Sequence, residues 1–334
     1  MTKKRVWLPI LVSIVFLVWL FRGTSFQQMS AAFVNADYKW IVPAIGVYFV
    51  GVWFRAWRWE VLLSPLKRVS ASRLFPIVVI GYMANDILPA RLGELVKTYI
   101  LGEKEGISKS SILATVAVER MFDGLALLSF MAVISLFVPL SGWIQSLVQL
   151  SALFFGGFLV VFLVVASSKG LTMGVVKVLL RLLPSRLCGK VEAVLDKFIE
   201  GLAALQSPWR LALIFVTSAL AWLAEAAMYY LVMFSFDFRQ SFPVLMLTTA
   251  TANIGITIPS LPGGIGPFEV AARETLGFFG VDSDIATAYS IVLHAALLLP
   301  PVLLGIFYLW REGLSLGRIV RQQPTETGSN AELS

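Results

Sequence analysis

The chain has 334 residues, of which 58% are hydrophobic and 14% are charged, and its formal net charge is +7. Soluble domains carry about a quarter charged residues, so this composition is that of an integral membrane protein. The positive charge therefore indicates contact with anionic lipid headgroups rather than with nucleic acid. The single Cys188 excludes an internal disulfide and a cysteine-based zinc site, and the single His294 argues against a His-rich metal site. We expect no metal and no cofactor.

Apolar runs of about 17–25 residues are long enough to cross a bilayer as helices. The sequence predicts six such spans, at 6–21, 40–63, 112–137, 148–166, 209–234 and 285–309. Two further apolar segments, 74–88 and 242–260, are shorter or interrupted by Pro and Gly, which is typical of re-entrant or broken helices. No small-residue cleavage site follows the first run, so we interpret it as an uncleaved span. The predicted fold is an all-α polytopic membrane protein.

Lysine and arginine residues set the expected orientation, because loops rich in them stay in the cytoplasm. They are concentrated in the stretches 3–5, 55–73 and 167–208 and after the last span. We therefore expect both termini on the cytoplasmic side of an inner membrane. One transmembrane domain is expected at 1–312, followed by a disordered tail at 313–334. Apolar residues at helical spacing in 167–208 favour two amphipathic helices, which either lie on the inner leaflet or pack against other helices with one face solvated.

An internal repeat relates the polar stretches 88–94 and 261–269. Both read Leu-Pro, two residues, an aliphatic residue, Gly and then Glu, with two additional residues in the second copy. A spacing of 173 or 174 residues relates the following pairs: Leu88 and Leu261, Gly106 and Gly280, Ala114 and Ala288, Val118 and Val292, Arg120 and His294. A spacing kept over about forty residues indicates duplication, with halves at about 40–166 and 209–309.

The charges around the two copies predict that the repeat is inverted. Residues 64–110 hold seven Lys or Arg and four acidic residues, whereas 235–284 hold two Arg and five acidic residues. By the positive-inside rule, the two copies enter the membrane from opposite sides. Inverted repeats with broken helices are a transporter architecture in which the substrate site lies where the repeats meet. We therefore predict that the two turns meet around one cavity.

Charged side chains within predicted spans are candidates for a functional site, because each costs at least about 2.5–3.5 kcal/mol at the centre of a bilayer. Glu119 and Asp123 are four residues apart and share a helical face, with Arg120 beside them. Either they neutralise one another as a structural cluster, or Arg120 is partly free to bind an anionic headgroup through its planar fork. Glu225 is either a functional carboxylate or an interhelical hydrogen-bond partner.

Residues near the two predicted turns form a second group of candidates: Asn85, Arg91, Glu94, Asn253, Glu269 and His294. A helix that begins near Arg91 would attract an anion with its free N–H groups, although a solvated loop explains the same charges. Glu269 either contributes to the site or stabilises a helix N-terminus. His294 either binds a headgroup or a proton or is a satisfied buried residue. A further group is interpreted as an anchor at the membrane interface: Trp53, Arg55, Trp57, Arg58 and Trp59.

Four motifs of the chain can be compared with known families: Asn85 with 88–94, then 106–108, 118–123, and 259–266 with Glu269. Together they resemble the transmembrane region of lysylphosphatidylglycerol synthases, a family also called flippase-like or uncharacterised protein family 0104. The resemblance covers roughly residues 5–312. It implies a bacterial or archaeal inner-membrane protein that moves an anionic or modified lipid between leaflets. The implied lipid is of the aminoacyl-phospholipid, glycolipid or polyprenyl-linked type.

The full synthases also carry a soluble aminoacyl-transferase domain, for which the roughly twenty residues after the last span leave no room. We therefore expect a stand-alone flippase rather than an enzyme. Without a nucleotide-binding motif, movement would be passive or driven by an ion gradient, with Glu225, Glu94 or His294 as proton carriers. One alternative is a headgroup transferase embedded in the membrane, although no nucleophile with a base accompanies the carboxylates. Another is a scaffold for a lipid-modifying or glycosyltransferase partner.

Overall fold

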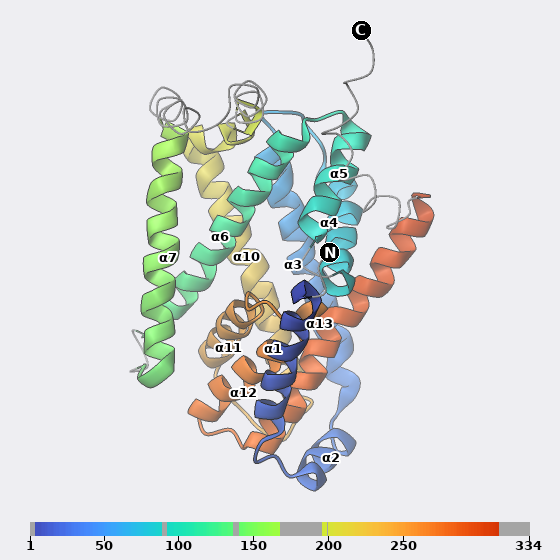
Figure 1. The fold of residues 1–334 in the computed structure, drawn as a ribbon, viewed down its shortest axis with the longest axis vertical. Coiled ribbons are helices and arrows are strands. Elements are labelled where there is room, and N and C mark those ends of the chain that lie inside the picture. Colours follow the sequence, from blue (N-terminus) through green and yellow to red (C-terminus); the bar gives the residue numbers. More distant parts are fainter. Residues whose placement is uncertain (1–3, 89–91, 136–139, 168–195, 199, 314–334) are drawn as a thin grey trace.

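The computed structural model describes residues 4–88, 92–135, 140–167, 196–198 and 200–313, which form helices and no strand (Figure 1). The predicted all-α fold is therefore confirmed. Arg91, most of the predicted amphipathic segment and the tail beyond residue 313 lie outside the described residues.

Six long helices each overlap a predicted span: α1 (Lys4–Phe21), α3 (Ile41–Leu63), α6 (Lys109–Ser135), α7 (Gly142–Ser167), α10 (Pro208–Met233) and α13 (Ser283–Arg311). By length and apolar composition alone, three of the helices in the described ranges can cross a membrane: Tyr38–Leu63, Pro208–Met233 and Ser283–Arg311. α1 and α2 (Phe26–Val34) are bent by 88° at the break between them. Taken together as one broken span, they are also long and apolar enough to cross a membrane. The chain is thus a multi-pass membrane protein.

The two predicted interrupted segments become helical hairpins. The first is α4 (Ala71–Ile87) with α5 (Gly93–Glu105), and the second is α11 (Phe242–Gly255) with α12 (Pro267–Phe278). Each hairpin stands between two long helices, so the order long, short, short, long occurs twice. We call α3–α6 the first unit and α10–α13 the second unit. Figure 1 shows α4 and α5 in the upper half of the view and α11 and α12 in the lower half, which is the arrangement of an inverted repeat.

Corresponding elements of the two units keep the spacing seen in the sequence. α5 and α12 begin 174 residues apart, and so do α6 and α13. Gly106 and Gly280, which follow α5 and α12, both have positive φ, at 65° and 80°. Glycine adopts this conformation without the steric cost that other residues incur. The same turn therefore leads into the last helix of both units.

A glycine in the first short helix of each hairpin lets the second short helix approach closely. A Cβ at Gly81 would lie 3.4 Å from the carbonyl oxygen of Gly93, and a Cβ at Gly255 would lie 2.9 Å from that of Pro267. Gly255 and Pro267 each lie 174 residues after their counterparts in the first hairpin, Gly81 and Gly93. Gly93, at the start of α5, leaves less room than Gly81 or Gly255, since a Cβ there would lie 2.0 Å from the carbonyl oxygen of Gly81. The Gly93 N–H also donates to Asn85 Oδ1 at 2.8 Å.

The turn of the second hairpin reaches the first unit. It contains η4 (Pro262–Gly264), and its glycines Gly263, Gly264 and Gly266 have φ of 79°, 83° and 101°. A Cβ at Gly263 would lie 3.8 Å from the carbonyl oxygen of Asp86, near the end of α4. The second turn therefore lies against the end of α4, as the predicted meeting of the two turns requires, whereas residues 89–91 of the first turn lie outside the described residues.

The N-terminal helix α1 holds this second turn from the outside. The Ser13 hydroxyl donates to the carbonyl oxygen of Ile265 at 2.8 Å and accepts from the N–H of Leu261 at 2.9 Å. Arg273 on α12 donates to the carbonyl oxygen of Leu20 at 2.6 Å. These bonds satisfy backbone groups that lack partners at the ends of short helices.

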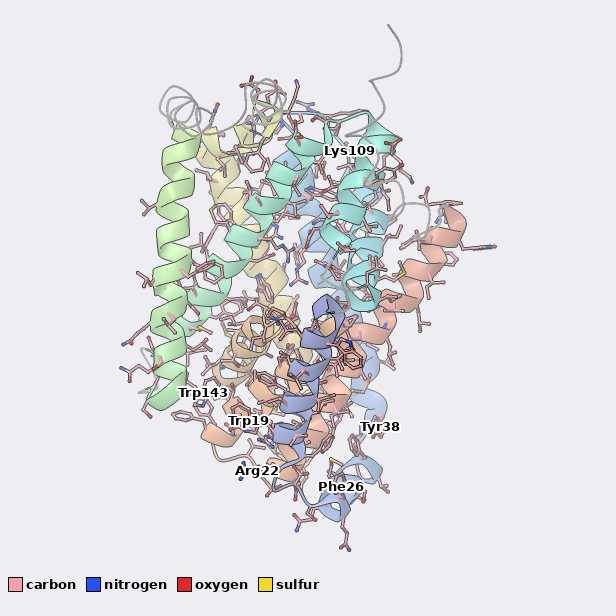
Figure 2. The ribbon with its side chains drawn as sticks, viewed as in Figure 1. Trp19, Arg22, Phe26, Tyr38, Lys109 and Trp143 are labelled. Atoms are coloured by element: carbon pink, nitrogen blue, oxygen red, sulfur yellow. The ribbon has the colours of Figure 1, made fainter. Side chains whose placement is uncertain are left out.

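Large apolar side chains cover the outer surface. Figure 2 shows the exposed aromatic residues Trp19, Phe26, Tyr38 and Trp143 towards one end of the molecule and Lys109 at the other end. Aromatic rings at one level are typical of a membrane–water interface.

Candidate functional site

A cavity of about 750 Å³ lies between the two units, with walls from α3–α7 and α10–α13. Seven predicted site residues line it: Asn85, Glu94, Arg120, Asp123, Glu225, Asn253 and His294. Glu119 and Glu269 are buried directly behind these residues, 2% and 6% exposed. Arg91 lies outside the described residues. The structure thus brings together candidates from both halves of the sequence.

The wall that α7 forms in this cavity is largely apolar and includes Leu147, Leu150 and Phe154, and α13 adds the apolar side chains of Leu297 and Leu298 to the lining. Leu150 and Phe154 are also each 65% exposed on the outer surface. The cavity therefore combines a charged interior with an apolar side that continues to the lipid-facing surface of α7.

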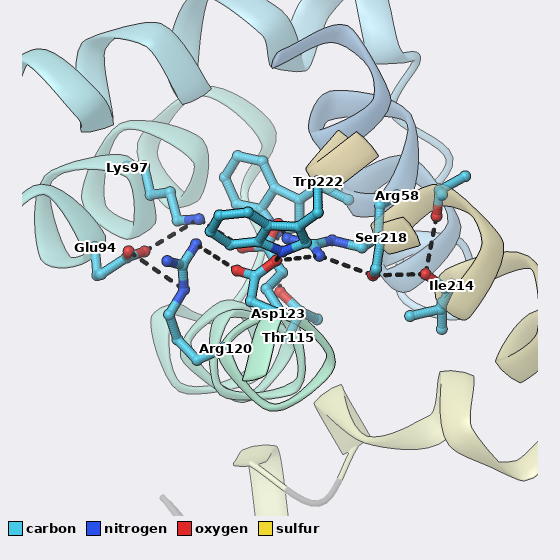
Figure 3. A network of polar contacts seen from close by, with 12 residues as sticks. Arg58, Glu94, Lys97, Thr115, Arg120, Asp123, Ile214, Ser218 and Trp222 are labelled. Atoms are coloured by element: carbon cyan, nitrogen blue, oxygen red, sulfur yellow. Dashed lines mark hydrogen bonds and ion pairs between the residues drawn. The ribbon is translucent and has the colours of Figure 1, made fainter. Parts of the chain in front are cut away.

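A network of buried ion pairs forms the charged side of the first unit (Figure 3). Arg58 on α3 donates from Nη1 to Asp123 Oδ1 at 2.6 Å and to the Ser218 hydroxyl at 2.8 Å. Its Nη2 lies 3.7 Å from Glu119 Oε1. The Trp222 indole N–H also donates to Asp123 Oδ1, at 3.0 Å. Such partners offset the cost of charges removed from water.

Lys97 on α5 completes this inner layer. Its ammonium group lies 2.5 Å from Glu119 Oε2 and 3.1 Å from Glu94 Oε2, and 4.8 Å from the centre of the Trp59 ring. Trp59 in turn donates from its indole N–H to the Thr115 hydroxyl at 3.0 Å. The lysine is 4% exposed, so it holds the carboxylates of α5 and α6 from behind the cavity.

Arg120 stands at the front of the network, facing the cavity. Its side chain is 48% exposed, and it lies 3.6 Å from Glu94 and 3.2 Å from Asp123. Its shortest ion pair is therefore longer than the shortest ones of Arg58 and Lys97, at 2.6 and 2.5 Å. Figure 3 shows it between Glu94 and Asp123, on the opposite side of Asp123 from Arg58. Arg120 is thus the cation of the network most accessible to a ligand.

A third group of polar contacts joins the two units across the cavity. Arg55 Nη2 lies 2.6 Å from Glu225 Oε2, and the guanidinium group lies 4.7 Å from the centre of the Trp222 ring. Asn253 donates to the other oxygen of Glu225 at 2.8 Å and lies 3.3 Å from the Tyr229 hydroxyl. α3, α10 and α11 therefore share one buried ion pair.

The second unit contributes the pair of Glu269 and His294. His294 Nδ1 lies 2.6 Å from Glu269 Oε1, and Nε2 lies 3.0 Å from the carbonyl oxygen of Gly263. The second carboxylate oxygen accepts from the N–H of Gly266 at 2.8 Å. The Phe268 ring stacks on the imidazole with 4.1 Å between centroids. Glu269 therefore both caps α12 and holds the histidine, which combines the two alternatives set out above.

The interpretation of Arg55 and Arg58 as parts of an interfacial anchor is wrong. They are 6% and 0% exposed and bind carboxylates inside the protein, and Trp59 is also fully buried. Trp53 and Trp57 are exposed, as an anchor requires. Lys97 is a third network residue that the sequence interpretation left out. Counting the charges in the sequence could have indicated all three residues, because the predicted spans hold more carboxylates than Arg120 alone can neutralise. The additional carboxylates require additional buried cations.

Among residues 4–313, where described, no group of three or more His, Cys, Asp or Glu side chains is placed to hold a metal ion. The charged side chains of this cavity can bind and orient a charged ligand, and they can exchange protons with it.

Comparisons with known proteins agree with this architecture. The family described as the lysylphosphatidylglycerol synthase TM region matches residues 6–305. Two UPF0104 membrane proteins of Methanothermobacter thermautotrophicus are 25% and 26% identical to the chain. The first match covers 79% of this chain and 83% of the relative, and the second 85% and 86%.

Glycosyltransferase AglD of Haloferax volcanii is 28% identical over 119 residues, which are 35% of this chain and 19% of that protein. No solved structure matches the chain. Because the family match spans nearly the whole chain, the protein belongs to the lysylphosphatidylglycerol synthase TM region family.

Proposed function

We propose that this protein moves phospholipids with anionic headgroups between the two leaflets of the membrane. The observation that carries the proposal is the cavity between the two units, which is charged inside and apolar towards α7. A phospholipid has a charged headgroup and apolar chains, so it matches both sides of such a cavity. Inverted repeats with hairpins that meet in the interior are also the architecture in which transporters place their substrate sites.

Arg120 is the residue we assign to the headgroup phosphate. It is half exposed, and its guanidinium group can donate two parallel hydrogen bonds to phosphate oxygens. Its present carboxylate contacts are loose, at 3.2 and 3.6 Å, so a phosphate can compete with them. Asp123 and Glu94 keep their inner partners, Arg58 and Lys97, when Arg120 turns to a ligand. The inner cations thus hold the site together while the outer one binds.

The apolar wall gives the acyl chains a route. Leu150 and Phe154 line the cavity and also face outward, so chains can stay in the bilayer while the headgroup enters. This arrangement spares the cost of moving the chains out of an apolar environment.

The family supports a lipid substrate, since its description names a lysylphosphatidylglycerol synthase. The partial match to glycosyltransferase AglD supports the expectation that such a membrane region works beside a group-transferring enzyme. A lipid-modifying partner is therefore part of the proposal.

Exchange of fluorescent phosphatidylglycerol between leaflets of phosphatidylcholine proteoliposomes tests this function. The label in the outer leaflet is quenched with dithionite, and the fraction that becomes accessible over time is measured. We expect faster exchange with the purified protein than in empty vesicles, and a slower rate with Arg120→Ala. Arg22→Ala is the matched control, because Arg22 is exposed in the loop after α1, away from the cavity.

Exchange equal to that of empty vesicles would refute the function. Equal rates for Arg120→Ala and the wild type would remove Arg120 from the site but leave lipid movement standing. Repeating the assay with fluorescent phosphatidylcholine in the same vesicles shows whether the headgroup charge matters. We expect phosphatidylglycerol to exchange faster, since Arg120 binds a headgroup with net negative charge more favourably.

A further inference from the structure

His294, the single histidine of the chain, faces an acceptor with each ring nitrogen. Nε2 lies 3.0 Å from the carbonyl oxygen of Gly263, and Nδ1 lies 2.6 Å from Glu269 Oε1. A carbonyl oxygen only accepts hydrogen bonds, so the Nε2 contact is a hydrogen bond only when Nε2 carries a hydrogen. A neutral imidazole has one N–H group, which leaves a lone pair on Nδ1 directed at Glu269.

Hydrogen bonds at both ring nitrogens therefore need one further proton. Either a doubly protonated ring donates to the carboxylate, or a protonated Glu269 donates to the neutral ring. Without this proton, a lone pair and a carboxylate oxygen face each other at 2.6 Å, a distance that only a hydrogen bond sustains. Since Oε2 of Glu269 already accepts from the N–H of Gly266, the proton lies between Oε1 and Nδ1.

The pair is buried but next to the cavity. The side chains of His294 and Glu269 are 4% and 8% exposed, and His294 forms part of the cavity wall. Water or a headgroup in the cavity can therefore take up the proton. The other titratable or charged side chains near this wall are Tyr48 and Arg55 on α3, Tyr82 and Asp86 on α4, Glu225 on α10, and Tyr229, which contacts Asn253 on α11.

Loss of the proton would loosen the meeting of the two units. The deprotonated pair repels at its present distance, so α13 and the start of α12 would move apart. His294 also holds the carbonyl oxygen of Gly263, and Gly263 is the residue that meets Asp86 of the first unit. The proton is therefore placed to control the contact between the two turns.

We propose that Glu269 and His294 bind and release one proton through the cavity, and that this proton couples lipid movement to a proton gradient. The proposal rests on the function proposed above and names its driving force. Release gives one proton to water or to a basic group in the cavity and leaves a neutral His294 and an ionised Glu269. No covalent bond changes, and the charge of the cavity wall falls by one.

The single histidine allows a direct test of the proton itself. Protein labelled with ¹⁵N-histidine, purified through an affinity tag without histidine and placed in lipid nanodiscs, gives signals from His294 alone. When the pH is raised stepwise, we expect Nε2 to remain an N–H nitrogen, while the Nδ1 signal changes as the pair loses its proton. A neutral ring with its hydrogen on Nδ1 would overturn the proposal.

Glu269→Gln provides the comparison for these spectra. The glutamine amide can donate to Nδ1 and its oxygen can accept from Gly266, so the pair is satisfied without a shared proton. We expect the neutral Nε2–H form over the range in which the wild-type signal changes. Identical spectra for the variant and the wild type would show that Glu269 does not hold the proton, which also overturns the proposal.

Coupling is tested in the proteoliposome assay with fluorescent phosphatidylglycerol and an imposed pH gradient, with the membrane potential clamped by potassium and valinomycin. We expect the gradient to shift the leaflet distribution of the lipid in the wild type. The exchange that remains in Glu269→Gln should not respond to the gradient. His294→Gln, expected to behave likewise, serves if Glu269→Gln does not fold. Glu274→Gln is the matched control, because Glu274 lies on the same helix and pairs with Arg273 away from the cavity.

The outcomes separate the two proposals. Wild-type exchange that ignores the gradient, or a gradient response that survives in both variants, overturns the coupling while lipid movement stands. Absence of wild-type exchange at every pH overturns lipid movement and the coupling with it, whereas the nuclear magnetic resonance result on the proton remains valid.

Discussion

In both units a carboxylate near the start of the second short helix pairs with a base on the following long helix, and the two units differ in that base. In the first unit Glu94 of α5 pairs with Arg120 of α6, and in the second Glu269 of α12 pairs with His294 of α13. Arg120 and His294 are 174 residues apart, as the helices that carry them are. Arginine stays charged at every physiological pH, whereas histidine gains and loses a proton near neutrality.

This difference separates two tasks. The first unit carries permanent cations, and three of them, Arg55, Arg58 and Lys97, are buried against carboxylates to hold the cavity wall. The second unit lines the cavity with a single base, His294, whose charge varies with one proton in the proposal above. We infer that duplication supplied two similar hairpins, after which one specialised in fixed charge and the other in variable charge.

Arg58→Met should have the largest effect on stability. The side chain is fully buried and binds Asp123 and Ser218, so its loss leaves an excess of negative charge inside the protein. Removing one partner of a buried ion pair costs about 3–5 kcal/mol. The free energy of unfolding is measured by SDS titration in mixed micelles. We expect a smaller loss for His294→Leu, since Glu269 can then stay protonated and neutral.

A loss for Arg58→Met no greater than that for His294→Leu would contradict this distinction between fixed and variable charge. Arg22→Met is the control for the loss of an exposed arginine, and we expect its free energy of unfolding to stay within about 0.5 kcal/mol of the wild type.

The two hairpins should also differ in their tolerance of a methyl group. A Cβ at Gly93 would lie 2.0 Å from a backbone oxygen of α4, whereas a Cβ at Gly255 would lie 2.9 Å from a backbone oxygen of α12. Backbone atoms cannot turn aside as side chains do. We expect Gly93→Ala to cost about 2–3 kcal/mol and Gly255→Ala about 1 kcal/mol, as overpacking does in protein cores.

Thermal unfolding in detergent checks the order of the two variants. Gly46→Ala is the control, because a Cβ there meets no atom within 4 Å. Equal unfolding midpoints for Gly93→Ala and Gly255→Ala would show that the two glycines leave the same room for a methyl group.

Much of this fold is predictable from the sequence, because its helices are long apolar runs and its repeat keeps one spacing. The meeting of Arg120 and His294 at one cavity follows from the same spacing once the repeat is taken as inverted. Arg55 and Arg58 were misplaced because arginines next to tryptophans occur both at membrane surfaces and in buried ion pairs. Only the packing of α3 against α6 and α10 distinguishes the two environments, and no local pattern records that contact.

Arg120→Lys should reduce lipid movement with little change in stability. Lysine keeps the positive charge but loses the planar fork that binds a phosphate through two parallel hydrogen bonds. We expect about a tenfold slower leaflet exchange of fluorescent phosphatidylglycerol, which corresponds to about 1.4 kcal/mol in the barrier. The midpoint of thermal unfolding should stay close to that of the wild type, because half of the side chain is exposed. An unchanged rate would mean that charge alone is required at this position.

The smallest expected effect tests the apolar wall, which is built on α7 and lacks a counterpart in the second unit. Leu150 and Leu153 are both exposed on α7, at 65% and 76%, but only Leu150 lines the cavity. We expect Leu150→Asn to slow the exchange of fluorescent phosphatidylglycerol about threefold, because a polar amide interrupts the apolar path for the chains. Leu153→Asn places the same amide in the bilayer and should leave exchange near the wild-type rate. Equal rates for the two variants would show that chains do not pass along this face.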